Sequence, residues 1–271
     1  MKRNFVIGTL AMAGGLVLAT PPVRAHDPVF GIGPHVLYQG GVEVAAEAHR
    51  NQAGDDKDSE LGLELTYGLT GDWAAGVELP YVRVDGPSGA DSGTGDLRLF
   101  TKYRFWRRDR LGLQESMALF GKVKLDTAET GLGTGTTDSI VGLAYGYESR
   151  KWYRFASLRY RRNGTADNGL RRGDAWRVDL VGGIRPRRTG YLEPDTVWLL
   201  ELNGEFIERA TRNGAVVADS GGTRWFVSPG IFWTLRNFAI KAGVQIPIAQ
   251  DLNGKQEKTD YRTKLVLEWH F

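Results

Sequence analysis

Charged side chains occupy alternate positions in several stretches of the sequence. Asp96, Arg98 and Lys102 are separated by apolar residues, and Lys122 and Lys124 repeat this spacing farther along the chain. In an extended segment, residues two apart share a face, so these charges would line one surface. A charged surface around a water-filled passage can select solutes. The residues predicted to line such an interior are Glu64, Glu78, Arg98, Lys102, Arg104, Lys122, Lys124, Glu201, Glu205, Lys241, Arg262 and Lys264.

The same charges also fit a closed interior, in which they pair across strands and fill space. An unpaired buried charge is costly, so pairing would be extensive wherever water is excluded. One stretch is unusually basic, and it hints at a wall that attracts anions. Its members are Arg98, Lys102, Arg104, Lys122 and Lys124.

His26 is the candidate for metal chemistry. If a signal peptide ends at Ala25, His26 becomes the amino terminus, and an amino-terminal histidine can bind Cu(II) through its α-amine and imidazole. His35 lies nearby in the sequence, but no third or fourth ligand is evident. A solvated tail residue is the simpler interpretation, and the sequence predicts neither a structural metal site nor a cofactor.

Catalytic motifs are absent from the sequence. The Gly-rich stretch 131–135 resembles a phosphate loop, but no Lys-Ser/Thr pair follows it, and it lies in a predicted loop. Neither G-x-S-x-G nor H-E-x-x-H occurs. A serine–histidine pair across strands, as in outer-membrane lipases, remains open, although no serine or histidine has a recognisable context. We therefore expect the protein not to be an enzyme.

The first 25 residues have the pattern of a secretory signal peptide. Lys2 and Arg3 precede an apolar stretch, and Val23-Arg24-Ala25 provides a small-x-small cleavage site. A membrane-anchoring helix is the alternative, but the apolar stretch is short and contains glycine. Residues 1–25 are thus assigned to a signal peptide, and residues 26–271 to the mature chain.

Removal of the signal peptide changes the charge balance. It would remove three of the 35 basic residues and no acid, leaving 32 basic and 32 acidic residues and a net charge of zero. This balance gives no support for nucleic-acid binding. The chain has no cysteine, which excludes disulfides and thiolate metal sites.

Twelve alternating segments follow residue 40. Successive side chains of a strand point to opposite faces, and each segment is long enough to cross a bilayer at a tilt. The joins alternate between short turns and long polar loops, as in outer-membrane barrels. The segments lie near 41–51, 60–70, 73–84, 95–106, 112–125, 138–149, 152–162, 174–185, 195–207, 223–235, 238–249 and 259–271.

The apolar faces and the tryptophans favour a membrane setting. Leu61, Leu63 and Leu65 share one face opposite Glu64. A soluble periplasmic barrel is the alternative, but it gives no reason for aromatic residues to gather near the short turns, whereas a bilayer interface does. The residues predicted to form this interfacial girdle are Trp73, Trp106, Trp152, Trp198, Trp233, Trp269 and Phe271.

The last segment resembles the terminal strand of outer-membrane barrels. It alternates without a break from residue 259 and ends on Trp269, His270 and Phe271. We therefore expect it to engage the barrel-assembly machinery. The predicted fold is all-β: an antiparallel up-and-down transmembrane barrel of about 12 strands, placed in the outer membrane of a Gram-negative bacterium after signal-peptide cleavage. The chain is divided into a signal peptide (1–25), a periplasmic tail or lumen plug (26–40) and an outer-membrane β-barrel (41–271).

Three stretches resemble the meta-pathway phenol-degradation family of outer-membrane proteins. The first runs from Leu63 to Trp73 and is followed by Glu78-Leu79-Pro80-Tyr81. The second is Gly95 to Phe105, and the third is Gly133-Thr134-Gly135 followed by Asp138. The chain departs from the family at 125–128, where a Pro-Thr-Gly-like stretch is usual. The resemblance implies an outer-membrane barrel that passes small, often aromatic or hydrophobic compounds, and it carries over no functional residue.

These observations lead to one functional expectation with two alternatives. We expect a porin-like channel for passive transport of small solutes, with outer-membrane lipid, lipopolysaccharide and a small-molecule solute as partners and no nucleic acid. The first alternative is a closed structural or interaction barrel. The second is a copper-linked protein that uses His26.

Overall fold

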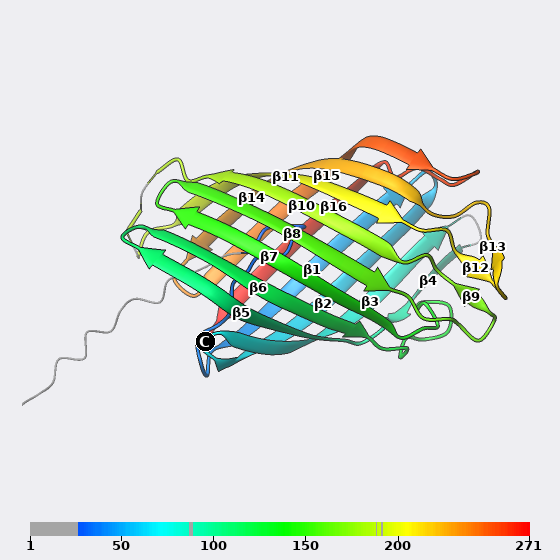
Figure 1. Ribbon diagram of the computed structural model, residues 1–271, viewed down its shortest axis with the longest axis horizontal. Coiled ribbons are helices and arrows are strands. Elements are labelled where there is room, and N and C mark those ends of the chain that lie inside the picture. Colours follow the sequence, from blue (N-terminus) through cyan, green and yellow to red (C-terminus); the bar gives the residue numbers. More distant parts are fainter. Residues whose placement is uncertain (1–26, 87–88, 188, 191) are drawn as a thin grey trace, which may run out of the picture.

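The computed structural model describes residues 27–86, 89–187, 189–190 and 192–271, and they form a β-barrel (Figure 1). The main sheet contains 13 strands, and β4 pairs only with β3. The other 12 strands close on themselves, because β1 pairs with both β2 and β16. Within the described residues, no helix is long and apolar enough to span a membrane.

The strands of the barrel wall match the predicted segments with small shifts at their ends. Closure removes the free edges that an open sheet would expose, and it pairs the backbone polar groups between neighbouring strands. The wall consists of β1 (Val42–Ala53), β2 (Asp56–Thr70), β3 (Trp73–Gly86), β5 (Arg98–Arg110), β6 (Leu113–Lys124), β7 (Asp138–Ser149), β8 (Trp152–Arg162), β10 (Ala175–Ile184), β11 (Asp195–Ile207), β14 (Gly222–Leu235), β15 (Phe238–Leu252) and β16 (Tyr261–His270).

The outer surface of the barrel is apolar. Leu63 and Leu65 of β2 are 52% and 47% exposed, whereas Thr66, the residue after Leu65, is buried. The same alternation places Leu200 of β11 outside and Glu201 inside. Large exposed apolar side chains on strand after strand are typical of a lipid-facing wall.

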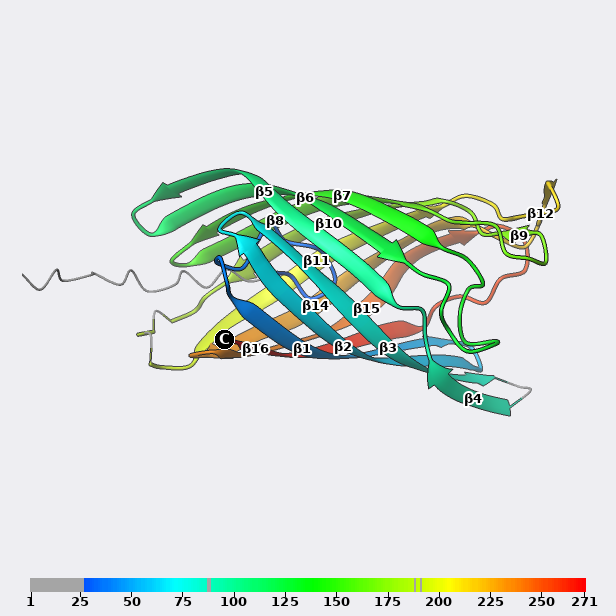
Figure 2. The same ribbon diagram turned by 90° about the horizontal axis from the view of Figure 1, so that it is seen from below.

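Several predicted long loops contain strands. The expected loop 52–59 is mostly strand, since β1 runs to Ala53 and β2 begins at Asp56. From Tyr81 onward β3 remains paired with β2 but pairs with β4 (Gly89–Thr94) in place of β5, and β4 projects past the barrel rim (Figure 2). Three short strands form a separate outer sheet, namely β9 (Leu170–Arg171), β12 (Thr211–Arg212) and β13 (Ala215–Val216).

The segment from Asp27 to Leu37 lies inside the barrel, and Tyr38, Gln39 and Gly40 are exposed before β1 begins. Val29 is only 1% exposed and packs with apolar side chains of the wall, including Tyr153, Phe155 and Phe232. Small wall residues make room for it: a Cβ on Gly243 would lie 2.9 Å from Phe30. The inner wall is thus shaped to the segment along one side.

Candidate functional site

A cavity of about 1660 Å³ runs along the barrel interior between the wall and the N-terminal segment. Its lining includes Val84 and Arg172 near the outer end, and Gly112 and Arg150 in the turns at the opposite end. Between these two ends, Ile32 and other residues of the N-terminal segment line the cavity. The cavity therefore reaches residues at both ends of the barrel while the segment narrows it.

Nine of the twelve residues predicted to face the interior line this cavity. The other three point inward but have partners that cover them: Glu201 contacts the N-terminal segment, and Glu205 pairs with Arg262. The nine lining residues are Glu64, Glu78, Arg98, Lys102, Arg104, Lys122, Lys124, Lys241 and Lys264.

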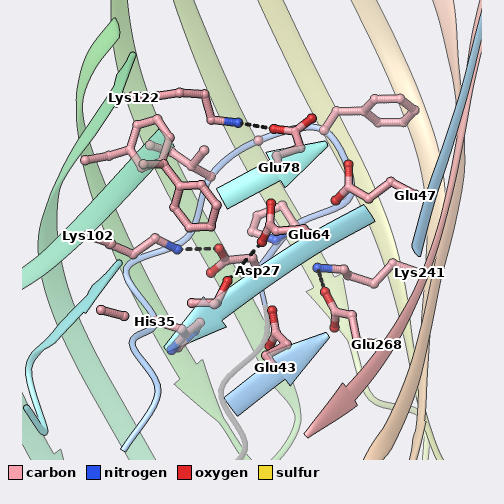
Figure 3. A pocket seen from close by; sticks show the side chains of 18 of the residues that line it. Asp27, His35, Glu43, Glu47, Glu64, Glu78, Lys102, Lys122, Lys241 and Glu268 are labelled. Atoms are coloured by element: carbon pink, nitrogen blue, oxygen red, sulfur yellow. Dashed lines mark hydrogen bonds and ion pairs between the residues drawn. The ribbon is translucent and has the colours of Figure 1, made fainter. Parts of the chain in front are cut away.

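Carboxylates gather on the wall formed by β1, β2 and β3. Glu43, Glu47, Glu64 and Glu78 all point into the cavity (Figure 3). Glu78 is 4% exposed and accepts hydrogen bonds from both Arg98 and Lys122, the latter at 2.8 Å. The acidic wall is therefore partly neutralised by bases from β5 and β6.

The five members of the predicted basic stretch, which lie on β5 and β6, all have acidic partners. Arg98 also donates to Glu60, at 2.6 and 2.7 Å. Lys102 pairs with Asp27 of the N-terminal segment at 2.5 Å (Figure 3), and Arg104 pairs with Asp72 at 2.8 Å. Lys124 contacts Asp96 at 2.8 Å. The structure thus gives this basic stretch a pairing role.

The N-terminal segment is held by the charged interior as well as by apolar packing. The Glu201 carboxylate accepts backbone N–H bonds from Val29 at 2.7 Å, Phe30 at 3.2 Å and Gly31 at 3.0 Å. His35 pairs with Glu148 of β7. Sequence reasoning did not identify these anchors, because nothing in the sequence indicates where segment 26–40 lies.

Three groups near the turn end could supply ligands to a cation. Atoms of Glu43, Glu268 and His270 lie within 4.8 Å of one another. Lys241 already forms an ion pair with Glu268 (Figure 3), so a base occupies this carboxylate cluster. His26, the residue considered for copper binding, lies outside the described residues.

The predicted interfacial aromatics lie around the end of the barrel that carries the short turns. Trp73, Trp152 and Trp198 are 45%, 45% and 56% exposed, and Trp73 donates its indole N–H to Thr101 at 2.7 Å. Trp106 and Phe271 are also exposed, whereas Trp233 and Trp269 are half-buried. A ring that is exposed on the wall and keeps a polar contact suits a bilayer interface.

The loops at the outer end are fixed by buried acids. Burial alone would raise the pKa of Asp96, but hydrogen bonds from Lys124, Thr134 and Ala128 lower it below its ordinary value. The pKa of Asp174 is lowered in the same way, against its burial, by the Asn163 amide and the Tyr160 hydroxyl. Both acids stay ionised and tie loop backbone to the rim.

Solved structures support the fold. The COG4313 outer membrane channel from Pseudomonas putida F1 superposes with a TM-score of 0.70 at 16% sequence identity, covering 91% of this chain and 100% of that chain. The NanC porin gives a TM-score of 0.52 at 9% identity, covering 83% and 98%. Both share the closed barrel, and at these identities the likeness concerns the fold alone. No curated protein matches this chain.

The resemblance seen in the sequence is confirmed by a family model that covers most of the chain. The model is described as "Putative MetA-pathway of phenol degradation" and matches residues 25–251. All three stretches that carried the resemblance fall within this range. The chain belongs to this family of outer-membrane-type β-barrels.

Proposed function

We propose that the protein is an outer-membrane channel for the passive uptake of small molecules. The observation that carries this proposal is the cavity of about 1660 Å³, which touches residues at both ends of a barrel with an apolar exterior. A wall of this kind shields a polar path from lipid, and the charges along the path filter solutes. The family description, which names phenol degradation, supports aromatic or hydrophobic compounds as solutes.

Liposome swelling tests the proposal. Mature protein refolded into liposomes should admit a small sugar such as arabinose faster than the trisaccharide raffinose, because the N-terminal segment narrows the cavity. Liposomes without protein provide the background rate. No swelling in either sugar, by protein shown to be folded, would contradict passive uptake.

A closed structural barrel is the second candidate, and the packing of the N-terminal segment favours it. Val29, Phe30 and Gly31 are bonded to Glu201, and Val29 belongs to an apolar cluster inside the wall. A variant lacking residues 27–39 distinguishes the two candidates. Swelling by the intact protein supports the channel, whereas swelling by the shortened protein alone would mean that the segment closes the barrel.

Three further proposals concern the setting of the protein. We infer that the mature chain lies in the outer membrane of a Gram-negative bacterium, with the short turns toward the periplasm, and contacts lipid and lipopolysaccharide. The exposed apolar wall supports the lipid contact. The aromatic carboxyl end of β16 supports recognition by the assembly machinery. A channel needs no catalytic residue, and we propose a non-enzymatic role.

A further inference from the structure

The register of the strands places four charged residues side by side on the inner wall. Arg159 of β8 pairs with Arg177 of β10, Arg177 pairs with Glu205 of β11, and Glu205 pairs with Arg224 of β14. Like charges directly opposite each other are destabilising unless other groups compensate. Three arginines with a single acid in one row therefore require explanation.

Positive charge in this region exceeds the negative charge available to it. Arg262 reaches Glu205 at 3.0 and 3.2 Å, and Arg177 shares the same carboxylate at 3.3 Å. The Arg224 guanidinium forms no hydrogen bond and no close ion pair with the described residues, and its Nε atom is buried. The acid of the row is therefore saturated by other arginines.

The neighbouring arginines also keep free donors. Arg159 pairs with Asp179 at 2.6 Å, and Arg161 pairs with Asp138 at 2.5 Å. In both arginines the Nε–H is buried without an acceptor. Arg172 joins them in the cavity lining and forms no ion pair within the described residues. Since each guanidinium has five N–H donors, the region offers more donors than its acids accept.

An apolar surface borders these arginines on the same inner wall. Ile140 of β7 is the direct partner of Arg161, and Phe120 of β6 is separated from Arg159 only by Gly142. Phe120 and Ile140 line the cavity together with Phe100. Neighbouring strands are about 4.8 Å apart, so the Cα atoms of Phe120 and Arg159, two strands apart, are separated by roughly 10 Å. An apolar patch thus adjoins an anion-attracting patch.

We propose that this region binds a small aromatic carboxylate during its passage through the lumen. Arg159, Arg161 and Arg177 face the carboxylate, because a planar guanidinium matches a carboxylate with paired hydrogen bonds. Arg172 adds attraction from the outer loop, and Phe120 and Ile140 face the ring. The inference rests on the proposed channel function, which supplies the route to the site, and it narrows the substrate class to aromatic acids.

Equilibrium binding tests this proposal independently of transport. Isothermal titration of the mature protein in detergent micelles should show saturable binding of benzoate. Binding of acetate, which lacks the ring, and of phenol, which lacks the charge, should be at least about tenfold weaker, since a charged hydrogen bond contributes about one order of magnitude in affinity. Binding of all three with equal strength, or of none, would overturn the assignment.

Substitutions locate the site. Arg177→Gln leaves Glu205 its partner Arg262, and Arg172→Gln breaks no ion pair, so both variants should fold. Each should weaken benzoate binding about tenfold, and Phe120→Leu should reduce the preference for benzoate over acetate. Arg83→Gln is the matched control, because Arg83 lies on the outer hairpin and pairs with Asp85. Equal loss in Arg83→Gln would indicate a non-specific charge effect and refute the site.

Transport is measured separately. In a planar bilayer, benzoate should reduce the KCl current through the wild-type protein. The reduction should be smaller for Arg177→Gln. A protein that binds benzoate but carries no current would contradict the channel and leave the binding site standing. A protein that carries current but binds no benzoate would contradict the binding site alone.

Discussion

Asp96 links the loop after β6 to the outer rim of the barrel. Its carboxylate accepts hydrogen bonds from Lys124 at 2.8 Å and from the backbone of Ala128 and Thr134 at 3.1 and 3.2 Å. Two of the stretches that resemble the family, Gly95-Asp96 and Gly133-Thr134, therefore meet at this carboxylate. Their joint role is to fix the loop.

This arrangement makes the loop sensitive to acid. Burial opposes ionisation of Asp96, but the hydrogen bonds lower its folded pKa below the ordinary 3.8, so its contribution is fully present above that value. It is lost as the pH falls through the folded pKa. Hydrogen exchange of residues 127–135 should accelerate there, whereas Asp96→Asn should exchange rapidly at every pH. Acid-insensitive exchange in the wild type would contradict this role.

At the level of single residues, alternation predicted which side chains point inward but not which of them pair. Glu78 meets both Arg98 and Lys122, and this follows from the register between β3, β5 and β6 rather than from spacing along one strand. Arg83 is a charged residue on the same face of β3 as Tyr81. It lies where β3 pairs with β4 beyond the rim, and it forms an ion pair with Asp85.

The N-terminal segment is the element that narrows the lumen, and its fit depends on glycine. A Cβ at Gly243 would lie 2.9 Å from Phe30 and 3.2 Å from Val29, so Gly243→Val should displace the segment. Overpacking of this kind costs roughly 1–3 kcal/mol. We expect faster hydrogen exchange at residues 29–36 and a larger conductance.

Gly182→Val provides the matched control for that experiment. Gly182 lies on the exposed face of β10, and a Cβ there would meet nothing within 4 Å. Gly182→Val should therefore leave both the hydrogen-exchange rates of residues 29–36 and the conductance unchanged. If Gly243→Val behaved like Gly182→Val, the segment would not depend on this contact.

The terminal strand β16 closes the barrel by pairing with β1, and its aromatic end is the proposed signal for the assembly machinery. Backbone hydrogen bonds join Phe271 to Val42 at 2.8 and 3.1 Å and do not depend on the side chain. Phe271→Ala should therefore retain the melting temperature of the refolded barrel and yet assemble poorly in cells. Heat-modifiable mobility on gels measures both, with Leu265→Ala as the control on the same strand. Normal assembly of Phe271→Ala would contradict a role for the aromatic terminus.

At the level of elements, strand positions were predictable because a barrel wall has a strict period of two and turn residues between segments. The outer strands β4, β9, β12 and β13 were not predicted, since β4 is polar and Gly-rich and the other three have only two residues each, too few to show alternation. The sequence did not decide whether the N-terminal segment is a periplasmic tail or a lumen plug. Its hydrogen bonds to Glu201 join residues about 170 positions apart, and no local pattern reports them.

For the whole molecule, the main feature is the distribution of charge around the lumen inside an apolar exterior. The wall closes through 12 strands, acids gather on β1 to β3, and arginines gather on β8, β10 and β14. In the proposed channel, we expect opposite charge on facing walls to produce a field across the lumen that orients a dipolar solute. This field depends on closure of the barrel, so it belongs to the molecule and not to any single strand.

Single-channel conductance of the refolded mature protein in a planar bilayer tests the central claim most directly. The cavity that reaches residues at both ends of the barrel predicts steady openings in KCl. Removal of residues 27–39 should increase the conductance, because those residues occupy part of the lumen. Silence at every voltage, from both the intact and the shortened protein, would contradict a conducting lumen.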